Sequence, residues 1–253
     1  MGDSSDVGSF KDSKVYYLQT NADWSISYNE EVLQEIHDQI VYFSDIFNKP
    51  KITLNFFEPS QIVPIMSSVR ELGLETQDVC ACDTDQVDSP PVSVKQYKSL
   101  LYGARTCSRL HLHLTPPRNL PLVDLPEFRM DSFVCNNAPW VTIDHLIYNF
   151  INCKKVELHD TTIRSRDFYK FVKAWIENST MEEMVVWSRL TLQDWHHNEI
   201  FGDIRYQRME VRMTTRDNEH KSGFAIRAND GKEAVVILDG GFTMATEFEV
   251  LTD

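Results

Sequence analysis

Apolar residues in the middle of the chain switch repeatedly between the spacing of a strand and the spacing of a helix. The run 110–114 alternates leucine with histidine, which is the period of a half-buried strand. Over 165–176 the apolar residues recur at intervals of three and four, which predicts a helix with one buried stripe. Further strands are predicted at 52–56, 72–74, 133–135, 156–159, 184–187 and 209–213, and helices at 29–47, 60–70, 93–101, 142–150 and from 191.

A strand followed by a helix, recurring roughly every 20 to 40 residues, is typical of leucine-rich-repeat-like proteins. We therefore predict an α/β fold built as an irregular leucine-rich-repeat-like stack of strand–helix units, with an ordinary open α/β sheet as the alternative. Asp-Gly and Gly-Gly pairs after residue 221 predict a C-terminal antiparallel β hairpin or meander that closes the stack. The predicted organisation is a disordered lead over 1–14, a repeat-like domain over 15–220 and the meander over 221–253, packed on the same domain.

Charge and composition narrow the class of protein. Among 253 residues, 25 Lys and Arg stand against 38 Asp and Glu, which gives a net charge of −13 and argues against nucleic-acid and anionic-membrane binding. We find no run of about 18 apolar residues for a membrane span and no signal peptide. Because the five cysteines are odd in number and mostly have apolar neighbours, we expect reduced thiols in a cytoplasmic or nuclear protein.

Candidate chemistry is sparse. The sequence carries no nucleophile-elbow, zinc-protease, dinucleotide or P-loop motif, so we expect no catalysis and no cofactor, with an unrecognised Cys or His site as the alternative. Cys80 and Cys82, together with His111 and His113, would offer four donors for a tetrahedral zinc ion. Their C-x-C spacing is tighter than usual and the two pairs fall on different predicted units. The sequence therefore predicts no metal site.

The predicted strands suggest a surface for a protein partner. The residues predicted to point into the core are Leu112, Phe133, Leu158, Val186 and Val211. Because side chains alternate across a strand, their neighbours point to the opposite face, which repeat proteins commonly use for binding. The candidate partner-binding residues are His111, His113, Val134, Glu157, His159, Val185, Trp187, Glu210 and Arg212. Trp187 would be the aromatic anchor. The alternative is that a loop or the terminal meander covers this face.

A family resemblance rests on five segments. Trp140–Leu146, Lys155–Leu158, Asp167–Ile176 and Met181–Met184, in this order, resemble the type 2 F-box-associated domain of the large nematode F-box families. Ile226–Val235 resembles the hairpin that closes such proteins, and the resemblance is clearest over 140–213.

The resemblance implies a non-catalytic protein–protein interaction module, the substrate-recognition part of an F-box receptor of an SCF ubiquitin ligase. Residues 1–28 are too short and too polar for an F-box. The Skp adaptor and cullin are therefore expected partners only if an F-box lies upstream. An F-box-less scaffold or inhibitory partner unrelated to ubiquitination is the alternative.

Overall fold

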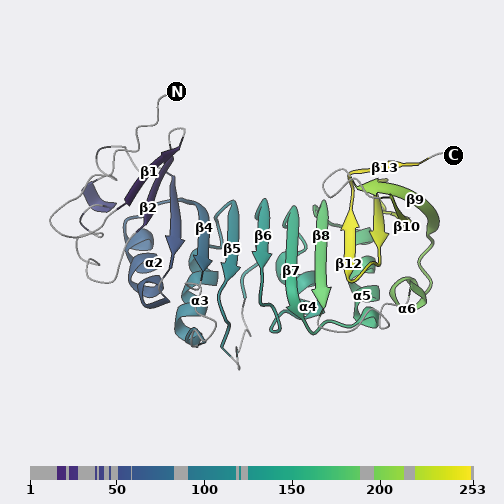
Figure 1. The fold of residues 1–253 in the computed structure, drawn as a ribbon, viewed down its shortest axis with the longest axis horizontal. Helices are drawn as coiled ribbons and strands as arrows, with labels where there is room; N and C mark the ends of the chain where they lie inside the picture. The colour runs from purple at the N-terminus through teal and green to yellow at the C-terminus, as the bar shows by residue number, and fades with distance from the viewer. Residues whose placement is uncertain are drawn as a thin grey trace. The chain divides into compact units, whose positions relative to one another are not determined.

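The structure is a computed structural model that describes 16–20, 23–27, 38, 40–42, 46, 51–57, 59–82, 91–117, 120, 125–188, 197–213 and 220–251 (Figure 1). The predicted disordered lead over 1–14 and the predicted helix start at 191 lie outside these residues, whereas positions 38, 40–42 and 46 of the predicted helix over 29–47 are helical. The chain divides into two units, Met1–Pro126 and Glu127–Asp253, which are described in turn.

The first unit is a sheet whose parallel strands are connected by helices. Its strands are β1 (Tyr16–Thr20), β2 (Asp23–Ser27), β3 (Ile52–Phe56), β4 (Thr76–Cys82) and β5 (Arg109–His113), in that spatial order. The 3-10 turn η2 (Pro59–Gln61) and helix α2 (Ile62–Glu71) connect β3 to β4, and α3 (Val94–Gly103) precedes β5. The first pair, β1 and β2, is antiparallel, and all later pairs are parallel.

Local sequence explains how α2 and α3 begin and end. Ser93 caps α3 with a capping box, in which its backbone N–H donates to Gln96 Oε1 at 3.0 Å. The predicted strand at 72–74 is wrong, because this segment ends α2. Gly73 has a left-handed φ of 62°, its N–H donates to the Arg70 carbonyl, and the N–H of Leu74 donates to that of Val69. This is a Schellman motif, and the strand starts only at Thr76.

The second unit continues the strand–helix alternation and then becomes antiparallel. Strands β6 (Ser132–Cys135), β7 (Lys155–Thr161) and β8 (Glu183–Ser188) are parallel. They are connected through α4 (Ile143–His145), the π-helical stretch η3 (Leu146–Phe150) and α5 (Ser165–Glu177). The later elements are α6 (His197–Phe201), β9 (Gln207–Met213), β10 (His220–Arg227), β11 (Glu233–Ile237), β12 (Phe242–Ala245) and β13 (Phe248–Val250).

The predicted antiparallel C-terminal strands are confirmed, and they extend the same sheet. The spatial order in the second unit is β6-β7-β8-β12-β11-β10-β9-β13, with β12 antiparallel to β8. The antiparallel part begins at β9 and includes its pairs with β10 and β13. The fold is therefore mixed α/β, with parallel strand–helix units followed by antiparallel hairpins, as Figure 1 shows in green to yellow.

Helix α5 shows why the second unit has a deep core. Phe168, Phe171, Val172 and Trp175 are buried along one side, as their spacing predicts. Phe168 stacks on Phe242 of β12 with ring centroids 4.2 Å apart, so the helix covers the antiparallel strands. The N-cap position of α5 is Arg164, and Ser165 is buried with its hydroxyl donating to Glu199.

Candidate protein-binding face

Strands β6 to β8 alternate as the sequence predicts. Phe133, Leu158 and Val186 are fully buried. Their neighbours Val134, Glu157 and Val185 are register partners, so they form one row on the opposite face. We call the residues on this side of the three strands the β6–β8 face; it consists of Val134, Glu157, His159, Val185 and Trp187.

The half-buried centre of the β6–β8 face is an ordered group of three side chains. Glu157 Oε1 accepts a hydrogen bond from His159 Nε2 at 3.0 Å, and the two side chains are 21% and 35% exposed. The His159 ring is stacked beside the Trp187 indole, with centroids 6.5 Å apart and planes inclined by 23°. Because all three side chains stand on paired strands and contact one another, little conformational entropy is lost when a partner binds them.

Gly241, the residue before β12, lies close to the end of β8 and to the Trp187 indole. A Cβ atom at Gly241 would lie 2.5 Å from the carbonyl oxygen of Val186 and 3.3 Å from Cε3 of Trp187. The absence of a side chain therefore lets the backbone before β12 approach the end of β8 and the indole edge.

Val185 is less accessible than the other members of the β6–β8 face. It is 1% exposed and lies between Glu157 and Thr243 in register. The same side of the antiparallel strands carries a buried cluster of Val211, Val235, Ile237 and Ala245, packed against Met209 and Phe248. Val185 is therefore covered, and the partly accessible side chains of the face are Val134, Glu157, His159 and Trp187.

The side chains of strand β9 point to the opposite sides of the sheet from those that the sequence predicts. The register partners lead from Val186 to Phe242, and then through β11 and β10 to β9. They place Arg208, Glu210 and Arg212 on the side of the sheet to which Val186 points. The prediction that Val211 shares the buried side with Val186 is therefore wrong. Arg212 Nη1 donates to Glu249 Oε2 of β13 at 3.2 Å, and Glu210 is exposed on that same side. These two residues lie on the opposite face from Trp187.

His111 and His113 lie in the first unit, where the structure brings them beside the predicted cysteine pair. Cys80 is the register partner of His111, and Cys82 that of His113, so all four side chains stand on one face of β4 and β5. All four are half-buried, whereas Leu110 and Leu112 behind them are fully buried. The strands predicted from the sequence do not include Cys80 and Cys82, although β4 continues to Cys82.

Neither Cys80 nor Cys153 has the lowered pKa of a nucleophilic thiol. The pKa of Cys80 is raised, first by a hydrogen bond with Cys82 Sγ, 3.4 Å away, and then by burial. Burial also raises the pKa of Cys153 to about 11. A catalytic cysteine needs a lowered pKa, so both shifts oppose the alternative of a cysteine enzyme.

The burial of the cysteines predicts how they react in the native protein. Cys107, Cys135 and Cys153 are at most 2% exposed, whereas Cys80 and Cys82 are half-buried. With excess iodoacetamide and a chelator that removes bound metal, we expect at most two modified thiols in the native protein and five after unfolding in urea, counted by intact mass. Early modification of Cys153 in the native state would contradict this packing.

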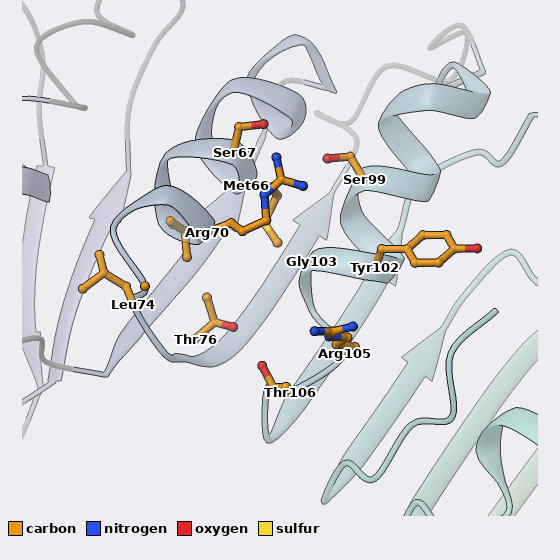
Figure 2. A pocket seen from close by; sticks show the side chains of 12 residues that line it. Met66, Ser67, Arg70, Leu74, Thr76, Ser99, Tyr102, Gly103, Arg105 and Thr106 are labelled. Carbon is orange, nitrogen blue, oxygen red and sulfur yellow. The ribbon is translucent and has the colours of Figure 1, made fainter. Parts of the chain in front are cut away.

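A second surface feature of the first unit is a groove of about 520 Å³ beside α2 and α3 (Figure 2). Arg70 and Arg105 line it together with hydroxyl groups of Ser67, Ser99 and Tyr102. The two helices approach closely, since a Cβ atom at Gly103 would lie 2.1 Å from Met66 Cε. The residues that line the groove come from separate segments of the chain, so no local sequence pattern indicates it.

Comparison with known proteins places one family in this chain. Residues 118–186 match the F-box associated family, a segment that runs through β6 and β7 and into β8. No curated protein matches the chain. Within the described part of the chain, no helix has the length and apolar character to cross a membrane. The resemblance found in the sequence is thus confirmed as a match to the F-box associated family over residues 118–186.

Proposed function

We propose that this chain is a non-catalytic protein-interaction module and that its partner binds the β6–β8 face. The observation that carries the proposal is the F-box associated match over 118–186, because the same segment builds β6, β7 and most of β8. The family description names an association and no reaction. In the finer form of the proposal, the successive units form a leucine-rich-repeat-like stack that presents this face to the substrate of an SCF ubiquitin ligase.

The chemistry of the β6–β8 face favours a particular kind of partner segment. Trp187 is half-buried and offers the accessible part of its indole ring; aromatic residues of this kind dominate the binding energy of many interfaces. Glu157 adds a partly exposed carboxylate next to it. A partner with an apolar side chain followed by Lys or Arg would fill both positions. The net charge of −13 would also attract a basic partner.

Two uses of the same face remain to be separated. As an F-box receptor, the protein would join the Skp adaptor and cullin through an F-box encoded upstream. As a scaffold or inhibitory partner, it would bind its partner without them. Recovery of Skp and cullin with the natural full-length protein supports the receptor, and their consistent absence while the partner is retained supports the scaffold.

The β6–β8 face is tested with Trp187→Ala in a tagged chain expressed in the cells of origin. We expect the recovery of at least one protein found with the wild type to fall about 30-fold or more, in line with an aromatic hot spot worth about 2 kcal/mol or more. Quantitative mass spectrometry of the purified complexes gives the measurement. The matched control is Tyr148→Ala in η3, since Tyr148 is also aromatic and is 72% exposed.

A second variant separates lost binding from lost folding. Glu157→Lys reverses the charge beside Trp187 and removes the hydrogen bond from His159. We expect it to lose the same partner while its thermal midpoint stays near that of the wild type. Unchanged recovery of every partner with both variants would place binding elsewhere, with the groove lined by Arg70 and Arg105 as the next surface to mutate.

A further inference from the structure

Three side chains of the first unit combine donor types that bind zinc. Cys80 and Cys82 point to the same side of β4 because they are two residues apart in a strand. His113 joins them from β5, where it is the register partner of Cys82. The two Sγ atoms and a ring nitrogen of His113 all lie within 4.8 Å of one another.

The spacing of these atoms is close to that of a zinc site. With Zn–S bonds of about 2.3 Å, two sulfur ligands of a tetrahedral ion lie about 3.8 Å apart. The Sγ atoms of Cys80 and Cys82 are 3.4 Å apart, so small rotations of the side chains bring them to that separation. Hydrogen-bonded pairing of β4 with β5 holds the backbone positions of all three residues.

We propose that Cys80, Cys82 and His113 bind one Zn²⁺ ion in the reduced protein. Each thiol releases its proton to solvent when its sulfur binds, so two thiolates balance the charge of the ion. Two sulfurs and one imidazole are soft and borderline donors, which suit zinc better than magnesium or calcium. Three protein ligands leave the fourth position for water or an exchangeable group, as in open zinc sites.

The surroundings limit which other side chain contributes. Asp78 stands on the same side of β4 but accepts two hydrogen bonds from Arg109, at 2.7 and 2.5 Å. That bidentate pair occupies both carboxylate oxygens. His111 is the register partner of Cys80 on the same face, but it is outside the group of three whose ligand atoms lie within 4.8 Å. It therefore supplies a matched control on the same strand.

The test uses the full chain, stripped of metal with a chelator and kept reduced with a phosphine. Titration with Zn²⁺ against a chromophoric chelator should give one tightly bound ion. We expect Cys80→Ser, Cys82→Ser and His113→Ala each to weaken binding more than about 100-fold, since even outer-shell changes at zinc sites cost about 10- to 100-fold. His111→Ala should keep the wild-type affinity. With Co²⁺ as probe, the wild type should show thiolate-to-cobalt charge-transfer absorption that both serine variants lose.

Circular dichroism shows whether each variant is folded. If a variant unfolds, the test is the rate of cysteine alkylation in the wild type with and without Zn²⁺. Bound Zn²⁺ is expected to slow alkylation of Cys80 and Cys82 and to leave the alkylation rates of the other cysteines unchanged. The proposal is overturned if the reduced wild type binds no zinc, if both serine variants keep its affinity, or if His111→Ala loses as much as His113→Ala. A Cys80–Cys82 disulfide that re-forms under these reducing conditions and excludes zinc would also overturn it. None of these results bears on the β6–β8 face.

Discussion

Replacing Trp175 by alanine is expected to lower the free energy of unfolding by about 3–5 kcal/mol. The side chain is 1% exposed and lies on the buried side of α5. Its indole Nε1 also donates to the carbonyl oxygen of Met181 at 3.1 Å, and this bond ties the helix to the turn before β8. The variant loses the packed ring and leaves that carbonyl without the indole donor. Urea denaturation followed by circular dichroism gives the change.

Two further variants separate packing from the hydrogen bond. Trp175→Phe keeps most of the aromatic volume and removes only the N–H donor, so we expect a smaller loss than for alanine. Lys170→Ala changes an exposed position of the same helix and should leave stability within about 0.5 kcal/mol. If Trp175→Ala unfolded at the same urea concentration as Lys170→Ala, the placement of α5 would be wrong.

Phe150→Ala is expected to cost about 3–5 kcal/mol as well, for a different structural reason. The Phe150 ring stacks against two nearly parallel rings, with centroids 5.0 Å from Phe128 and 4.5 Å from Phe133. All three rings are 0% exposed, so removal of the Phe150 ring leaves a cavity between η3 and β6. Thermal and urea unfolding measure the loss.

The control for Phe150 lies two residues away. Tyr148→Ala removes an aromatic ring from the same π-helical stretch, but that ring is 72% exposed, so we expect little change in stability. Equal effects of the two substitutions would contradict the burial of Phe150 at the centre of this core.

The sequence predicts best where an apolar period is long or a cap is explicit. The stripe through Phe168 and Trp175 fixes α5, and the alternation in β6 to β8 fixes which side chains are buried. The helix predicted from 142 begins there, with the Thr142 hydroxyl accepting from the N–H of His145. These signals are local, so tertiary contacts reinforce them and do not change them.

Other features depend on pairing that local patterns do not encode. Leu72 and Leu74 alternate like a strand, but the helix end at Gly73 decides the segment. Val211 is buried as expected, yet its side of the sheet is set by the chain of antiparallel pairs from β8 to β9. Cys80 meets the histidines only because β4 pairs in parallel with β5. Each of these outcomes requires knowledge of which strands become neighbours.

The central claim, that the β6–β8 face binds a protein partner, has one most direct measurement. It is the dissociation constant between purified chain and the partner enriched with the wild type, determined by isothermal titration for wild type, Trp187→Ala and Tyr148→Ala. We expect Trp187→Ala to weaken binding about 30-fold or more, which corresponds to the 2 kcal/mol of an aromatic hot spot, and Tyr148→Ala to match the wild type. Equal dissociation constants for all three folded proteins would contradict the account.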